Sequence, residues 1–277
     1  MGAFFRRLRK DKVGLIGFIG VMLIVFIGLF APLIATHSPT EMFNEYRLQS
    51  PNSEFWLGTD DLGRDIFSRL IYGARVSLMV GIIAVGIGAG IGLACGLIAG
   101  FFQGRIDNII MRIMDVLFAF PDLLLALAIV AILGPNLKNT MIAIGIVFIP
   151  VFTRLVRSSV ITVKEMDYIS NAQSIGASNK RVIVKHILPN ILAPFLVQTT
   201  LALSSAILAE ASLSFLGLGI QPPDPSWGSM LNSSRRFMEL APWTAIFPAI
   251  FIVFTILCFN LLGDSLRDLL DPRLRKK

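Results

Sequence analysis

The stretch 164-KEMDYISNAQSIGASNKRVIVKHILPNILAP-194 is a polar segment between two strongly apolar runs. On a helical wheel its first half gathers four residues on one face and leaves polar side chains on the other, which is the pattern of an amphipathic helix. Gly176 is expected to end this helix, because glycine adopts a left-handed conformation at little cost. The residues that share the face are Tyr168, Ile169, Ala172 and Ile175.

A second short helix is expected after Gly176. Ser178 can cap its first turn, and Pro189 is predicted to stop it. Its apolar stripe faces away from Arg181 and Lys185. The segment is therefore predicted to be a helix–glycine–helix loop outside the hydrocarbon, with an apolar surface that needs a partner. The stripe consists of Val182, Ile183, His186 and Ile187.

The composition places the chain in a membrane. Of 277 residues, 55% are hydrophobic and only 16% are charged, which is too apolar for the surface of a soluble domain. The net charge of +7 does not indicate nucleic acid, because the basic residues flank the apolar runs, as membrane topology and anionic lipid require. Cys95 and Cys258 lie inside apolar runs and are expected to be small core residues, without a disulfide or metal role.

Six apolar runs are long enough to be transmembrane helices, since a hydrocarbon core of about 30 Å needs roughly 20 helical residues. The first follows a basic N-terminal segment and is longer than the apolar region of a cleaved signal peptide. The sequence therefore predicts an all-α integral membrane protein with six transmembrane helices. The predicted spans are residues 13–34, 76–102, 113–133, 140–156, 191–216 and 243–262.

Glycines recur at every fourth position in the second span, so another helix can approach it almost to backbone contact. These glycines are Gly88, Gly92, Gly96 and Gly100, with Gly104 just beyond.

Two carboxylates lie within or beside predicted spans. Asp122 follows Pro121, which is expected to kink the third span, and it either lines a pathway or sits at the interface. Glu210 lies in the fifth span. Because an unpaired carboxylate in hydrocarbon is costly, Glu210 is either a gate or subunit-contact residue, or a group at the outer water boundary.

The loop before the second span is polar and acidic. Asp60, Asp61 and Asp65 resemble part of a calcium loop, but the full ligand pattern is missing. Asp65 can instead cap a short helix with an apolar face, which is predicted to lie in the membrane interface. That face consists of Ile66, Phe67, Leu70 and Ile71.

The distribution of the 25 Lys and Arg residues predicts the orientation. Most of them fall in the N-terminal segment, after the second span, between residues 154 and 185, and in the C-terminal tail. The positive-inside rule therefore predicts that both termini and the 164–189 loop are cytoplasmic.

Four sequence runs resemble one family. Gly176 and the Leu188-Pro189 pair match the spacing of the "EAA" loop of ATP-binding-cassette (ABC) importer permeases, with Ser170 and Asn171 where Glu and the first Ala usually stand. Three further runs resemble signatures of the oligopeptide, dipeptide and nickel permeases, specifically their C-type subunit. These runs are LGTDDLGRD at 57–65, LSFLGLGIQPPDPSWGSM at 213–230 and GDSLRDLLDPR at 263–273.

The resemblance implies a type I importer permease, with a MetI-like core of five helices preceded by one N-terminal helix. Residues 1–75 would hold the N-terminus, the first helix and an extracytoplasmic loop, 76–264 the core with a coupling loop at 161–190, and 265–277 a cytoplasmic tail. The loop would dock into a groove on a cytoplasmic ATPase. The alternative is a helical loop packed on its own protein or on the lipid surface. The implied coupling residues are Tyr168, Ile169, Ser170, Ala172, Ile175, Gly176, Ala177, Arg181, Leu188 and Pro189.

The implied partners are a homologous B-type permease, two cytoplasmic ATPases, an extracytoplasmic solute-binding protein and the lipid of a bacterial or archaeal cytoplasmic membrane. The sequence has no G-x-x-x-x-G-K-[ST] loop, so ATP and Mg²⁺ are expected on the partner ATPases, with no cofactor and no catalytic site on this chain. Peptides are the expected solute, and nickel chelates or oligosaccharides are the alternatives. An ion-coupled secondary transporter remains a different class, for which only Glu210 and Asp122 are candidate ion-coupling carboxylates. A membrane-embedded enzyme would need a cluster of polar catalytic groups in the spans, and the sequence shows none.

Overall fold

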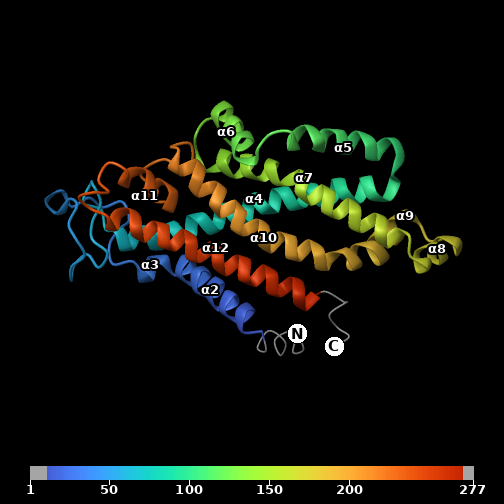
Figure 1. Cartoon of the computed structure of the whole chain (residues 1–277), viewed down its shortest axis with the longest axis horizontal. Helices are drawn as coiled ribbons and strands as arrows, with labels where there is room; N and C mark the ends of the chain where they lie inside the picture. Colours follow the sequence, from blue (N-terminus) through green and yellow to red (C-terminus); the bar gives the residue numbers. More distant parts are fainter. Residues whose placement is uncertain (1–10, 271–277) are drawn as a thin grey trace.

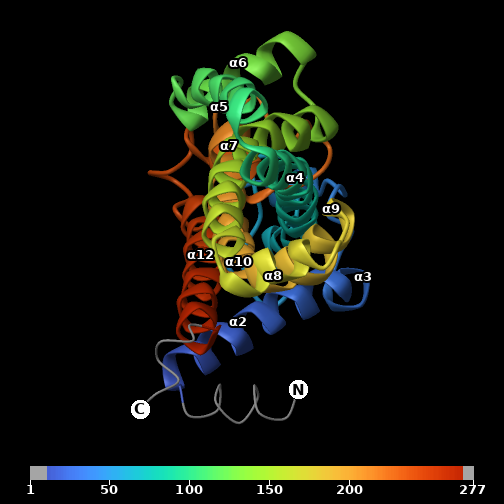
Figure 2. The same cartoon turned by 90° about the vertical axis from the view of Figure 1, so that its right-hand side faces the viewer.

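The computed structural model describes residues 11–270. Within this range the chain is helical and has no strand, apart from an isolated β-bridge between Thr59 and Asp65. The long helices form an elongated bundle (Figures 1 and 2). In chain order the elements are α2 (Lys12–Leu29), α3 (Ala31–Ile34), η1 (Asn44–Tyr46), α4 (Ile66–Phe102), α5 (Gly104–Phe118), α6 (Asp122–Leu133), α7 (Leu137–Lys164), α8 (Asp167–Ser174), α9 (Asn179–Val182), the π-helical turn η2 (Ile183–Ile187), α10 (Leu188–Phe215), α11 (Trp227–Ser234) and α12 (Trp243–Leu270).

Loops and short helices gather at the two ends of the bundle (Figure 1). The helices α8 and α9 lie at one end, and α11 lies at the other together with the loop of residues 36–65. We call these the α8 end and the α11 end.

Five helices are long and apolar enough to cross a membrane, and a sixth crossing results if the bent pair α5–α6 counts as one span. The number agrees with the six predicted spans, but the third differs in form. Instead of a kinked helix, the chain makes an 88° bend between α5 and α6. Pro121 explains the break, because it has an extended backbone, with φ −57° and ψ 134°, and disfavours helical geometry at the residue before it.

The predicted short interfacial helix after Asp65 is wrong. Residues from Ile66 onward are the first turns of α4, which continues without a break to Phe102. Asp65 does cap it, since its Oδ2 accepts a hydrogen bond of 2.9 Å from the backbone N–H of Ser68. Ile66, Leu70 and Ile71 are buried, so this face is held by protein, which removes the reason for it to lie on lipid.

The glycines of α4 face α7. A Cβ added at Gly92 would lie 2.5 Å from the Cβ of Phe152, and one at Gly96 would lie 2.6 Å from the Cβ of Val156. Gly88 and Gly100 make equally close approaches to α7. Only a residue without a side chain fits at these distances. Gly104 is not part of this strip, because nothing lies within 4 Å of its added Cβ.

The segment after Gly176 differs from the prediction at its end. The helix that begins at Asn179 is not stopped by Pro189, because α9, η2 and α10 follow one another without a gap. In the π turn the N–H of Leu188 bonds to the carbonyl of Ile183, five residues back. Pro189 therefore directly follows the π turn, and this local change in the hydrogen-bond pattern lets the helix continue past a residue without an N–H.

Candidate functional site

The α8–α9 loop has the helix–glycine–helix form expected from the sequence. Gly176 has φ +85°, and it follows α8 in a Schellman motif. The N–H of Gly176 bonds to the carbonyl of Gln173 at 2.9 Å, and the N–H of Ala177 bonds to the carbonyl of Ala172 at 3.1 Å. Ser178 then caps α9 through a hydrogen bond from the N–H of Arg181. The turn between the two helices is thus fixed by its own backbone.

The predicted apolar face of α8 is divided between two directions. Ile169 is fully buried and packs in a core cluster with Val182 and Ile187. Tyr168 is 40% exposed and Ile175 is 87% exposed. The loop therefore has an inner side that attaches it to the bundle and an outer side with apolar groups free to contact another molecule. Of the other residues expected to couple, Ala172, Ala177 and Leu188 are half-buried, and Ser170, Gly176, Arg181 and Pro189 are exposed.

Ser170 does not replace the ionic group that its position usually carries in the resembled motif. Its hydroxyl donates to the carbonyl of Asp167 at 2.7 Å, within the same helix. A different contact fastens α8 to α10, where Asn190 Nδ2 donates to the hydroxyl of Tyr168 at 3.1 Å.

Glu210 is fully buried between helices. Its Oε1 accepts a hydrogen bond of 2.7 Å from Ser214, and its Oε2 accepts one of 3.1 Å from Ser77 of α4. Ser214 Oγ also accepts from the N–H of Ile220, which ties in the segment after α10. The side chain therefore has no surface to offer a solute or a neighbouring subunit. In this structure Glu210 joins α4 to the α11 end of α10. Its expected role as a gate or subunit-contact residue stays a prediction.

Asp122 is the first residue of α6 and is exposed. It lines an open cavity together with residues 144–151 of α7. These residues occupy the middle part of α7, which runs from Leu137 to Lys164. The role expected for Asp122, lining a pathway or sitting at the interface, stays a prediction.

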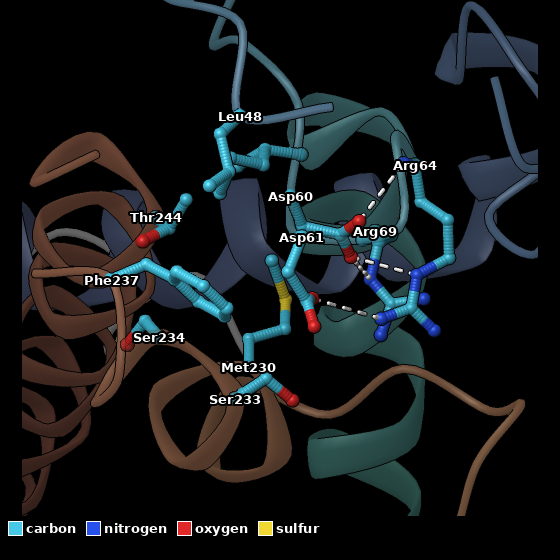
Figure 3. A pocket seen from close by; sticks show the side chains of 11 residues that line it. Leu48, Asp60, Asp61, Arg64, Arg69, Met230, Ser233, Ser234, Phe237 and Thr244 are labelled. Carbon is cyan, nitrogen blue, oxygen red and sulfur yellow. Dashed lines mark hydrogen bonds and ion pairs between the residues drawn. The ribbon is translucent and has the colours of Figure 1, made fainter. Parts of the chain in front are cut away.

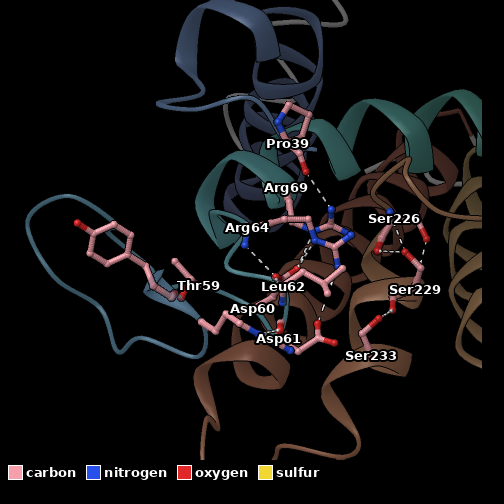
Figure 4. Close-up of polar contacts among 12 residues, drawn as sticks. Pro39, Thr59, Asp60, Asp61, Leu62, Arg64, Arg69, Ser226, Ser229 and Ser233 are labelled. Carbon is pink, nitrogen blue, oxygen red and sulfur yellow. Dashed lines mark hydrogen bonds and ion pairs between the residues drawn. The ribbon is translucent and has the colours of Figure 1, made fainter. Parts of the chain in front are cut away.

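An ionic cluster at the α11 end was not anticipated from the sequence. Asp60 pairs with Arg64 at 2.7 Å and approaches Arg69 Nε to 3.5 Å (Figure 3). Arg69 also donates to the carbonyl of Pro39 at 2.9 Å (Figure 4). The carboxylate that resembled a calcium ligand is therefore occupied by two arginines, and no group of three or more metal-ligating side chains occurs among residues 11–270.

The small cavity beside this cluster reaches α11 and has a volume of only about 10 Å³, enough for one water molecule (Figure 3). It is too small for a solute. Next to it, Ser226 and Ser229 cap α11 reciprocally, each backbone N–H bonding to the other hydroxyl at 3.1 Å (Figure 4). The cluster thus joins the 36–65 loop to α4, and the small cavity lies between it and α11.

A second ionic contact missed by the sequence analysis holds α5 against α7. Asp107 accepts two hydrogen bonds from Arg157, at 2.5 and 2.6 Å, and Asp115 pairs with Arg154 at 2.7 Å. Asp107 and Asp115 are eight residues apart, which places them on one face of a helix, and this spacing was the available signal.

Comparison with known proteins gives the class. Residues 92–276 match the family described as binding-protein-dependent transport system inner membrane component, and residues 1–51 match the N-terminal TM domain of oligopeptide transport permease C. Two solved structures share the fold. They are a chain of the MetNI methionine ABC transporter, with a TM-score of 0.61, 15% identity and coverage of 74% of this chain and 98% of that one, and a chain of an amino acid ABC transporter, with a TM-score of 0.57, 17% identity and coverage of 73% and 94%.

Curated relatives match nearly the whole chain. The dipeptide transport system permease protein DppC of Alkalihalophilus pseudofirmus is 51% identical, covering 98% of this chain and 89% of the relative. The di/tripeptide transport system permease protein DppC of Pseudomonas aeruginosa is 48% identical, with 98% and 92% covered, and the glutathione transport system permease protein GsiD of Escherichia coli is 47% identical, with 98% and 90% covered.

The fold and these matches define a multi-pass permease of an ABC importer. The chain belongs to the binding-protein-dependent transport system inner membrane component family. The resemblance drawn from the four sequence runs is therefore confirmed.

Proposed function

We propose that this chain is the C-type permease subunit of an ATP-driven peptide importer. It would form the solute pathway with a homologous B-type permease, receive solute from an extracytoplasmic binding protein and be driven by two cytoplasmic ATPases that bind ATP and Mg²⁺. The observation that carries the proposal is the α8–α9 loop, whose exposed Tyr168 and Ile175 lie on a turn fixed by its own hydrogen bonds. Such a surface suits insertion into a groove of another protein.

The buried side of this loop supports a mechanical role. Ile169 and Val182 share one core cluster with Val160 of α7 and Ile191 of α10, two helices that extend through the bundle. A movement of the loop by an ATPase would therefore be passed directly to both helices, as alternating access requires.

The orientation is also part of the proposal. The α8 end carries Lys164, Lys180, Arg181 and Lys185, and the positive-inside rule places such an end in the cytoplasm. The N-terminus and the C-terminal tail would then be cytoplasmic, and the α11 end would face the binding protein. This arrangement puts the loop on the side where ATP is available.

Short peptides are the proposed solute, because the relatives reported above are named for dipeptide, di/tripeptide and glutathione transport. A nickel chelate or an oligosaccharide is the alternative within the same architecture.

The experiment is affinity purification of the tagged chain from its native membrane, followed by reconstitution of the co-purified complex in vesicles. We expect a second permease and ATPases to co-purify, and uptake of labelled dipeptide to require ATP and survive ionophores. Competition with a nickel chelate and with an oligosaccharide tests the alternatives. Uptake driven by an ion gradient without ATP would establish a secondary transporter and overturn the proposal.

A further inference from the structure

Two open cavities lie along one side of α10. One, of about 420 Å³, lies between α6, α7 and α10, and the other, of about 470 Å³, lies between α7, α10 and the end of α12. Gln198 lines both. The two cavities therefore meet at Gln198 and follow one another along α10, from the middle of the bundle towards the α8 end, and we call them together the α10 groove.

The α10 wall of this groove has a polar line. Gln198, Ser205 and Ser212 recur at seven-residue intervals, so they lie on one face of the helix, and all three line the first cavity. The facing residues from α6 and α7 are mainly apolar, including Ala126, Val147 and Phe148. The Gln198 amide has no hydrogen-bond partner among residues 11–270. An unpaired amide would be costly against lipid, which indicates that this face meets water or a polar molecule.

Opposite charges mark the two parts of the groove. Asp122 lines the first cavity, and Arg267 lines the second. Both are exposed, and neither has an ion-pair partner within the described part of the chain. A free carboxylate beside the middle of α7 is tolerated in a membrane protein where it faces an aqueous cavity.

We propose that this groove is this chain's wall of the solute pathway, where Asp122, Gln198 and Arg267 contact in succession the ammonium group, the backbone amides and the carboxylate of a zwitterionic short peptide. The proposal rests on the proposed function and adds the residues that the solute meets. From Pro194 to Ser212 the groove follows α10 for about 27 Å, whereas an extended dipeptide spans only about 7 Å. The peptide therefore passes from one group to the next and never contacts both ends at once.

Accessibility of the groove is the first test. In the assembled importer, with Cys95 and Cys258 replaced by serine, Gln198→Cys should react with a small charged thiol reagent, and the modification should stop uptake. Thr200→Cys is the control, because it lies two residues along α10, outside both cavities, and bonds only to the carbonyl of its own helix at Leu196. An unreactive Gln198→Cys in a complex that still transports peptide would mean that a helix of the neighbouring permease fills the groove, which overturns the proposal.

The second test removes the charge of Asp122 or of Arg267 and measures the turnover of peptide transport. The binding protein is kept at a saturating concentration, so that the affinity of the permease for the binding protein does not affect the result. Asp122→Asn should lower turnover of a dipeptide about tenfold or more, the effect of losing roughly one charge-assisted hydrogen bond. It should leave turnover of the N-acetylated dipeptide unchanged from the wild-type value. Arg267→Gln should likewise lower turnover of the free dipeptide, because it removes the contact with the carboxylate. It should leave turnover of the C-terminally amidated dipeptide unchanged from the wild-type value.

The two levels of inference fail differently. If the wild-type importer transports no peptide, the proposed function fails before any variant is compared. If the wild type transports peptides and Asp122→Asn and Arg267→Gln keep its rates for free and blocked dipeptides alike, the function stands and the groove assignment is wrong.

Discussion

Glu210 shows how a single carboxylate can be kept inside an apolar bundle. Both of its carboxylate oxygens accept hydrogen bonds from serine hydroxyls, those of Ser214 and Ser77, so its polar atoms are satisfied without water. The sequence indicated that the residue would need such partners, but Ser77 lies 133 positions away, and only the packing of α4 against α10 brings the two together.

Glu210→Ala is expected to destabilise the permease, because it leaves two buried hydroxyls without an acceptor at a cost of about 1–3 kcal/mol each. Glu210→Gln keeps one carbonyl acceptor and the same shape, so its effect should be smaller. The melting temperature of the purified protein in detergent measures both. Equal melting temperatures for Glu210→Ala and the wild type would mean that the hydrogen bonds to Glu210 do not hold α4 to α10.

Asp60 is another largely buried carboxylate, at the α11 end of the bundle. It compensates the positive charges of two buried arginines, Arg64 and Arg69. Asp60→Asn should loosen the 36–65 loop by about 3–5 kcal/mol, because Arg64 and Arg69 lose their compensating charge while buried. Asp61→Asn is the matched control. Asp61 reaches Arg64 only at 3.9 Å and is more exposed, so its loss should cost no more than about 1 kcal/mol. Limited proteolysis of the loop in proteoliposomes compares them, and equal cleavage rates would show that the buried pair adds no stability.

At the scale of helices, the contact between α4 and α7 depends on the glycine strip. Gly92→Ala should prevent close packing, because its methyl group would lie 2.5 Å from the Cβ of Phe152. Gly90→Ala, on the same helix, has nothing within 4 Å and should be neutral or slightly stabilising, since alanine favours helix by about 1 kcal/mol over glycine. The yield of folded protein in detergent distinguishes the two. A normal yield for Gly92→Ala would show that α7 moves aside without penalty.

The turn between α8 and α9 provides the second test at this scale. No neighbour lies within 4 Å of an added Cβ at Gly176, so a substitution there is limited by the backbone alone. With φ at +85°, valine should cost roughly 1–2 kcal/mol and turn α8 relative to α9, whereas asparagine tolerates this region. Gly176→Val should therefore lose bound ATPase or hydrolyse ATP without moving solute, and Gly176→Asn should retain coupling. Pull-down and uptake in vesicles are the measurements, and full coupling in Gly176→Val would make the loop a passive connector.

The sequence predicts helices better than it predicts where they bend or end. The length and apolarity of the runs located the spans, because the thickness of the hydrocarbon core sets how many apolar residues a transmembrane helix needs. Local rules failed at Pro121 and Pro189. The same residue type permits an 88° break at one position and a continuous helix at the other, and the difference depends on the π turn that precedes Pro189. The pattern of polar and apolar residues near Ile66 indicated an interfacial helix. These residues instead form the first turns of α4, and tertiary packing buries them.

At the scale of the whole molecule, the form of the α8–α9 loop could be predicted because it is one continuous segment with its own periodicity. The groove along α10 could not, because it arises from α6, α7, α10 and α12 together. Gln198 and Arg267 carry no local signal that separates them from other polar residues near span ends. Asp122 was singled out by its charge, but its depth was not predictable until α6 was placed beside α7.

The orientation of the whole chain in the membrane gives the last prediction. With Cys95 and Cys258 replaced by serine, single cysteines are introduced at Asn179, exposed at the α8 end, and at Glu54, exposed in the 36–65 loop. A membrane-impermeant maleimide should label Glu54→Cys in intact cells and Asn179→Cys only after permeabilisation, because the α8 end is rich in lysine and arginine. The two sites lie at opposite ends of the bundle, so their labelling must be reciprocal (Figure 1). Labelling of Asn179→Cys in intact cells would place the loop where no ATP is available, and an ATPase could not then act on it.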